Sequence, residues 1–193
     1  MSHKQKEIIP KTKQKLMDAY WQLYVANNPE KITVRMITNK AGFNRGTFYA
    51  YFLDIEDLHS QIEDELLPSE ENFEKLRKAT FSKNSREIIE IFMQEEKNSG
   101  EKVSYLLSSK GSLSFQNKFK NKLRELIMKY APLDLNDSKK VIDYKVDIVC
   151  IIFYETLCYW YCKGKQLFSE EEMINMMLKI IIFGLSDNKT LTP

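Results

Sequence analysis

Residues 33–52 read TVRMITNKAGFNRGTFYAYF and contain the signals for two short helices separated by a turn. Thr33 is a good N-cap, and the isoleucines on either side of it are spaced as a hydrophobic staple. Gly42 can adopt a left-handed conformation in the turn without steric cost, and Asn44 can cap the helix that follows. The stretch therefore predicts one helix that ends before Gly42 and another that begins after Asn44.

A third helix is predicted ahead of this pair, over residues 12–27. Its apolar side chains recur at the spacing of an amphipathic helix: Leu16, Tyr20, Leu23 and Tyr24. Three short helices in about fifty residues, the last two joined by a turn that contains glycine, are typical of a helix-turn-helix domain. In such domains the second helix of the pair enters the major groove of DNA.

The helix that follows Asn44 is predicted to have a buried face and a polar face. Phe48 and Phe52 are four residues apart and are expected to anchor one face in the core. Gly46 costs about 1 kcal/mol relative to alanine inside a helix, and close approach of a DNA backbone would explain its presence. The side chains able to reach phosphates and base edges are Asn44, Arg45, Thr47 and Tyr49.

Taken together, these residues resemble the TetR family of transcription regulators. The likeness rests on residues 33–37, 41–52 and 56–58, and it covers roughly residues 10 to 65. It implies phosphate contacts from Thr33 and Asn44 and a backbone contact from Tyr51, while Arg45, Thr47 and Tyr49 face the major groove. The predicted DNA-binding set is Thr33, Asn44, Arg45, Gly46, Thr47, Tyr49, Tyr51, Lys11 and Lys13.

One position departs from the family pattern. Ile55 stands where the family usually has a lysine near the start of the fourth helix, so that phosphate contact is lost or comes from elsewhere. The candidates are Lys11, Lys13 and Lys15, near the start of the first helix. The helix dipole disfavours cations there by about 0.3 to 1 kcal/mol each, which a phosphate partner would justify. A solvated helix end is the alternative explanation.

The charge of the chain is concentrated at one end. Residues 1–53 carry nine lysines and arginines against three acids, a net charge of +6, so the rest of the chain carries −4 of the total of +2. A basic segment followed by an acidic one is expected when one end of a protein meets a polyanion. This distribution favours double-stranded DNA as a partner.

Composition limits the remaining possibilities. The 193 residues include only 6 glycines and 5 prolines with 43% hydrophobic residues, which favours an all-α fold. Three cysteines in one apolar segment fit a reducing, cytoplasmic location. We expect no signal peptide and no membrane span, because the most apolar run, residues 148–161, is shorter than the ~20 residues required and contains Glu155. We find no catalytic motif, and we expect no enzyme activity, cofactor or metal.

We predict about nine helices in two domains, a helix-turn-helix domain over residues 1–53 and a larger helical domain for regulation and dimerisation over residues 54–193. In the second domain, Pro68 interrupts one helix and Ser69 begins another. Further helices are expected over residues 85–97, 101–109, 113–130, 138–163 and 169–185. Residues 98–100, Asn-Ser-Gly, are expected to separate the first two of these.

The last two predicted helices are apolar on more than one side and must be covered. Two such helices from each subunit would form a four-helix dimer interface, which is how the TetR family pairs its subunits. The interface residues we predict are Ile152, Trp160, Met173, Met176, Met177, Ile180 and Phe183. Residues 160–164 and 169–173 are also similar to a TetR subgroup common in low-GC Gram-positive bacteria.

The resemblance also implies a small-molecule inducer held in the larger domain. The predicted pocket residues are Tyr105, Phe119, Tyr144, Phe153, Tyr154 and Glu155, with Phe115 as a further aromatic candidate. Ordinary core packing is the alternative for each aromatic residue. Glu155 could bind a cationic or hydroxylated ligand, pair with a lysine of a second subunit, or reach solvent. Cys158 and Cys162 could form a thiol sensor or soft-metal site, or simply be buried.

The leading hypothesis is a homodimeric TetR-type repressor that a ligand releases from a palindromic operator. One alternative is a helical protein-interaction or coactivator module of the same fold that binds no operator. An enzyme is the second alternative, and two histidines give it little acid-base equipment.

Overall fold

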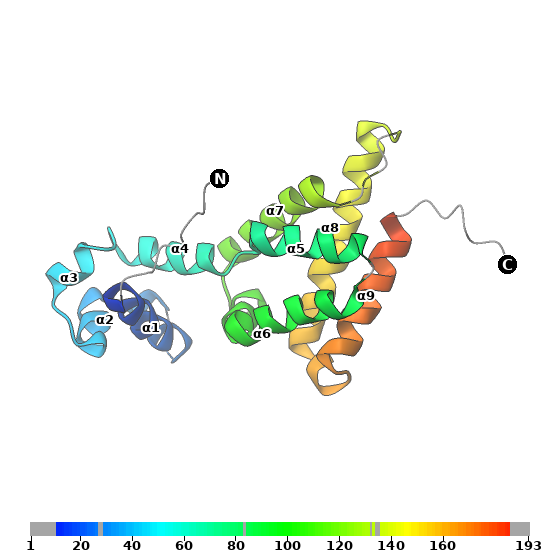
Figure 1. Cartoon of the computed structure of the whole chain (residues 1–193). Coiled ribbons are helices and arrows are strands. Elements are labelled where there is room, and N and C mark those ends of the chain that lie inside the picture. The colour runs from blue at the N-terminus through cyan, green and yellow to red at the C-terminus, as the bar shows by residue number, and fades with distance from the viewer. Residues whose placement is uncertain (1–10, 27–28, 83, 132, 134–135, 186–193) are drawn as a thin grey trace. The chain divides into compact units, whose positions relative to one another are not determined.

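A computed structural model describes residues 11–26, 29–82, 84–131, 133 and 136–185 of the chain (Figure 1). These residues form α-helices and short 3-10 turns, and no strand occurs among them, so the predicted all-helical class is confirmed. The chain divides into two compact units after Glu65. We call residues 11–65 the head and residues 66–185 the body.

The head consists of four helices with a 3-10 turn after the first. They are α1 (Lys11–Ala26), η1 (Pro29–Lys31), α2 (Val34–Ala41), α3 (Arg45–Tyr49) and α4 (Ile55–Glu65). The predicted caps are confirmed, because the side chain of Thr33 accepts a hydrogen bond from the backbone N–H of Met36, and that of Asn44 from Thr47. Gly42 has φ of 76°, the left-handed conformation predicted for the turn.

α4 belongs to the head because its inner face is bonded to α1. Leu58 and Ile62 are buried, and a chain of polar groups runs beside them. Tyr20 Oη lies 3.0 Å from Nδ1 of His59, whose Nε2 lies 3.1 Å from Oε1 of Glu63, a carboxylate with only 1% of its surface exposed. The head therefore continues to Glu65, past residue 53 where the sequence pattern placed the domain boundary.

The body consists of five helices with a 3-10 turn before the last. They are α5 (Glu70–Phe81), α6 (Ser85–Leu107), α7 (Leu113–Tyr130), α8 (Lys139–Cys162), η2 (Gly164–Gln166) and α9 (Glu170–Leu185). Ser69, Ser138 and Ser169 accept hydrogen bonds from backbone N–H groups of the first turns of α5, α8 and α9. α9 packs along α8 (Figure 1).

One predicted break does not occur. α6 runs through residues 98–100, where the sequence predicted two helices over 85–97 and 101–109. Gly100 is buried, and a Cβ placed on it would lie 2.2 Å from Oε2 of Glu96. The glycine therefore makes room for a side chain one turn earlier instead of ending the helix.

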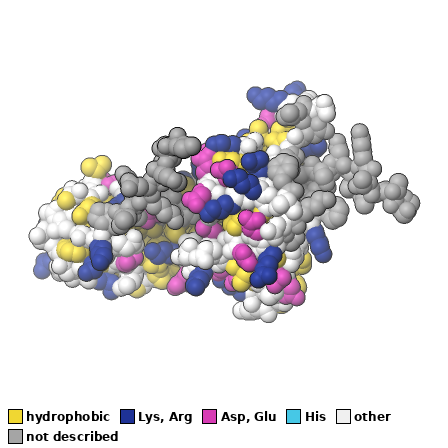
Figure 2. All heavy atoms as spheres, viewed as in Figure 1, with side chains coloured by type: hydrophobic (Ala, Val, Ile, Leu, Met, Phe, Trp, Pro, Cys, Tyr) yellow, Lys and Arg dark blue, Asp and Glu magenta, His cyan; other side chains and the backbone are white. Residues whose placement is uncertain are grey.

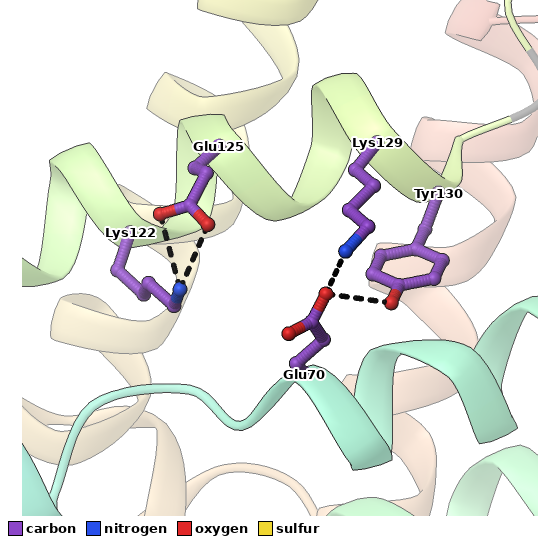
Figure 3. Close-up of polar contacts among 5 residues, drawn as sticks. All are labelled: Glu70, Lys122, Glu125, Lys129 and Tyr130. Carbon is purple, nitrogen blue, oxygen red and sulfur yellow. Dashed lines mark hydrogen bonds and ion pairs between the residues drawn. The ribbon is translucent and has the colours of Figure 1, made fainter. Parts of the chain in front are cut away.

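Surface ion pairs connect the ends of neighbouring helices in the body. Glu70, in the first turn of α5, accepts hydrogen bonds from Lys129 and from Oη of Tyr130 at the end of α7 (Figure 3). These contacts lower the pKa of the Glu70 carboxyl and raise that of the Lys129 ammonium. Acidic and basic side chains are intermixed over this face of the body (Figure 2), so it carries no extended patch of one charge.

Candidate nucleic-acid interface and body cavity

α3 presents one face to the core and the other to solvent. Phe48 is fully buried and packs against Phe52, with ring centroids 5.4 Å apart. The next side chain, Tyr49, is 56% exposed, and Arg45 and Gly46 are exposed as well. Because the phenyl groups fix the rotation of this short helix, its outer face is held by packing rather than by its own length.

The cap of α3 also orients its polar side chains. Oδ1 of Asn44 accepts hydrogen bonds from the backbone N–H of Thr47 at 2.8 Å and from Oγ1 of Thr47 at 3.1 Å. A Cβ added to Gly46 would meet only Oδ1 of Asn44, at 3.2 Å. The protein itself therefore leaves almost enough room for a side chain at Gly46, and its own packing does not explain the glycine.

The remaining predicted DNA-binding residues lie elsewhere on the head. Thr33 and Lys11 are exposed, and Tyr51 is partly buried beside Phe52. Lys13 is partly buried on α1, with Nζ 5.9 Å from the ring centroid of Phe52 and 3.9 Å from Oε1 of Glu65.

Lys13 also lies close enough to the start of α4 to act on it electrostatically. The pKa of the Asp57 carboxyl is lowered mainly by a hydrogen bond from the backbone N–H of Leu53, then by one from Gln61, with a smaller contribution from the charge of Lys13. This is the region in which Ile55 replaces the expected lysine.

The body contains a cavity of about 120 Å³ that opens to solvent. Its walls come from the segment before α5 and from α5 to α9. Its lining includes Leu66, Phe92, Phe119, Phe153, Trp160 and Met173. This volume is below the ~300–1,000 Å³ typical of sites for drug-sized ligands.

Only part of the predicted pocket lines this cavity. Phe119 and Phe153 do, whereas Tyr105, Tyr144, Tyr154 and Glu155 are not among its lining residues. Tyr144 is 70% exposed and Glu155 is exposed, while Tyr154 is buried against Phe119. The sequence reasoning missed the contribution of α5 and α6, whose signal was the apolar pairs Phe73 with Leu76 and Phe92 with Met93.

The predicted interface residues are divided between the inside and the outside of the body. Trp160 and Met173 line the cavity, Met177 is buried, Ile152 is partly buried, and the side chain of Phe183 lies outside the described residues. Met176 and Ile180 on α9 are exposed. α8 adds a stripe of exposed side chains that we call the α8 stripe: Val141, Tyr144, Ile148, Ile151 and Tyr159.

The cysteines form no disulfide. Cys150 and Cys158 are half-buried and Cys162 is exposed. Burial raises the pKa of the Cys150 thiol to about 11, which disfavours the reactive thiolate. The described part of the chain holds no cluster of three or more metal-ligating side chains, and none of its helices is long and apolar enough to cross a membrane.

Several solved structures have the same fold. An activator of a dihydroxyacetone kinase operon matches with a TM-score of 0.62 and 16% identity over 91% of this chain and 96% of the other. A TetR transcriptional regulator from Streptococcus agalactiae matches with a TM-score of 0.62 and 23% identity, over 89% of this chain and 93% of the other. A TetR-family regulator from Streptomyces coelicolor matches with a TM-score of 0.60 and 14% identity, over 91% of this chain and 81% of the other.

These matches show that the chain has the fold of TetR-type transcriptional regulators. No family model and no curated protein matches its sequence.

Proposed function

We propose that this chain is a homodimeric TetR-type transcription regulator of the cytoplasm that binds a palindromic operator and is released from it by a small molecule. The outer face of α3 is the observation that carries the proposal. It presents Arg45 and Tyr49 to solvent from a helix fixed by Phe48, and Gly46 leaves that face flat. A flat, polar, rigidly held helix is what major-groove recognition needs.

Phosphate contacts would come from the residues around α3. Thr33 and Asn44 cap α2 and α3, and helix N-termini with exposed caps favour phosphate. Lys13, beside Phe52 and near Asp57, supports the hypothesis that α1 supplies the charge that Ile55 does not. Lys11 is exposed on the same helix.

The α8 stripe supports the homodimer. Exposed large apolar side chains in one row mark an interaction surface, and Met176 and Ile180 of α9 extend it. A two-fold pairing through α8 and α9 would give the dimer two copies of α3, one for each half-site of a palindromic operator. We place Glu155, which is exposed on α8, at this interface or in solvent rather than in the ligand site.

Release by a ligand is supported by the position of Leu66 in the cavity wall. Leu66 directly follows Glu65, the last residue of α4, so a molecule bound against it acts on the covalent connection to the head. A ligand shifts DNA binding only by the difference between its affinities for the two states of the protein.

A second candidate function is a coactivator or protein-interaction module of this fold. One similar structure is that of an operon activator, which makes activation a reasonable alternative to repression. The assignment to a subgroup of low-GC Gram-positive bacteria remains a prediction. We propose no enzymatic activity.

The test is DNA binding measured against salt. Genomic fragments selected by the purified protein should bind with an affinity that falls steeply between about 50 and 200 mM salt. Tyr49→Ala should reduce discrimination between DNA sequences. Lys11→Ala should weaken binding to all DNA sequences and lower the slope of log affinity against log salt concentration by about one. Lys110→Ala, which removes an exposed charge from the body, is the matched control. Negligible binding at every salt concentration would favour the coactivator alternative.

A further inference from the structure

The cavity of the body has an apolar interior that opens to solvent. Phe73 and Leu76 of α5, Phe92 of α6 and Phe153 and Leu157 of α8 contribute to its wall. Burial of apolar surface contributes about 25 cal/mol per Å², so a chain or ring system of about ten carbons gains substantial affinity here. The apolar wall does not by itself favour a charged ligand over a neutral one.

The charged residues of the wall all have the same sign. Glu95, Glu96 and Glu170 line the cavity, and none of its lining residues within the described chain is a lysine, arginine or histidine. A shallower depression shares Glu96 and Glu170 and adds Glu90 and a single cation, Lys97. The wall of the cavity is therefore rich in carboxylates.

One of the three carboxylates has a cationic partner. Glu96 accepts a hydrogen bond from Lys165 and another from Oη of Tyr161, the latter at 2.7 Å. Glu95 accepts a hydrogen bond from the neutral amide of Asn72. Pairing with Lys165 therefore offsets one negative charge and leaves the charges of Glu95 and Glu170 at the wall.

The titration of Tyr161 agrees with this geometry. Burial and the hydrogen bond to Glu96 raise the pKa of the phenol, and the charges of Glu96 and Glu170 raise it further. The phenol therefore stays neutral and keeps its proton toward Glu96. Its ring lines the same cavity as those of Trp160 and Phe92, and Nζ of Lys165 lies over it, 5.0 Å from the ring centroid.

We propose that the cavity binds a cationic amphiphile, with its positive head group at Glu95 and Glu170 and its apolar part against Phe92, Phe153 and Leu157. This inference rests on the proposed function and names the chemical class of the releasing ligand. A cation is attracted by two carboxylates beside an apolar wall, whereas an anionic head group would be repelled by them.

The test compares two probes with the same ten-carbon tail. Isothermal titration of the full chain, below the micelle concentrations, should show decyltrimethylammonium binding about tenfold or more tightly than decanoate, which corresponds to at least about 1.4 kcal/mol. The double variant Glu95→Gln with Glu170→Gln should remove this preference. Glu101→Gln, an exposed position of α6 outside the cavity lining, is the matched control and should retain it.

A second variant keeps the proposal testable if the double variant does not fold. Leu76→Trp should fill the cavity and abolish tight binding of the cation while the thermal unfolding transition is retained. Equal or tighter binding of decanoate, or a preference unchanged in the double variant or in Leu76→Trp, would overturn the inference.

The DNA experiment separates this inference from the proposed function. If the protein binds DNA but not decyltrimethylammonium, the ligand class is wrong and the function stands. If it binds the cation in the cavity but no DNA, the ligand class stands and the function fails. If both bind, the cation should weaken DNA binding in the wild-type chain and not in the double variant.

Discussion

The head and the body differ in what they leave exposed. Among described residues, the head exposes three large apolar side chains, Val25, Tyr49 and Leu53, and the body exposes twelve, several of them in the α8 stripe. Phe48 in the core of the head is completely buried, and the body contains a cavity. A unit with a filled core can hold a recognition surface by itself, while the body has surfaces that fit a second subunit and a ligand.

The largest effect is expected for Phe48→Ala, which tests whether the buried core holds the head together. Removing a fully buried phenyl group should lower the free energy of unfolding of the head by about 3–5 kcal/mol, because the surrounding core does not fill the space. Tyr49→Ala, at the neighbouring exposed position, should cost about 1 kcal/mol or less. Calorimetry of both variants measures the difference. Similar costs would show that the head is not held by its core.

The second test is Ile151→Glu in the α8 stripe. Ile151 is 57% exposed, so the substitution should leave the fold of one subunit intact while placing a charge in the proposed interface. We expect the dimer dissociation constant to rise about 100-fold, or about 2.7 kcal/mol, in sedimentation equilibrium. Leu113→Glu, at a 71% exposed position of α7, is the control and should have no effect. An unchanged dimer would remove the α8 stripe from the interface.

The third test uses pH and Asp57 in the head. The folded pKa of this carboxyl lies below its ordinary 3.8, so its contribution is present above the unfolded value and is lost as pH falls through the folded value. Asp57→Ala should lower the melting temperature at neutral pH by a few degrees, about 1 kcal/mol for a lost cap.

The difference between wild type and Asp57→Ala should shrink as pH falls through the folded pKa, to the part that a neutral acceptor supplies. Asp57→Asn keeps an acceptor for the N–H of Leu53 without the charge, and should show a smaller loss. A difference that stays constant from neutral pH into acid would contradict the role of the charge.

The smallest effect on stability is expected for Gly46→Ala. Alanine gains up to about 1 kcal/mol in helix propensity and meets only Oδ1 of Asn44 at 3.2 Å, so the head should be as stable as wild type or slightly more stable. DNA affinity should nevertheless fall about tenfold if a phosphate backbone approaches the glycine. Reduced stability with unchanged DNA affinity would show instead that the glycine serves the fold.

The head was predictable because its signals are local. Thr33, Gly42 and Asn44 act on backbone groups within a few residues of themselves, so their roles follow from the sequence order. The position of Lys13 beside Phe52 was not predictable, because it depends on how α1 packs.

The sequence predicted where the helices of the body lie along the chain, but not which face of each helix is buried. α7 has the predicted bounds, and α8 and α9 begin one residue after their predicted first residues, Ser138 and Ser169, which cap them. A helix that is apolar on two sides gives no sequence signal for which side is internal. Trp160 therefore lies at the cavity and Tyr144 at the surface, the reverse of their predicted roles.

The buried Gly100 has a consequence for how this sequence can vary. Any side chain at position 100 would collide with the Glu96 carboxylate, which Tyr161 and Lys165 hold in place. A larger residue at position 100 requires the Glu96 carboxylate to move or to become shorter, and either change breaks its contacts with Tyr161 and Lys165. In an alignment of homologous chains, positions 96, 100 and 165 should therefore change together, and a glycine that looks like a helix break should covary with an acid and a base.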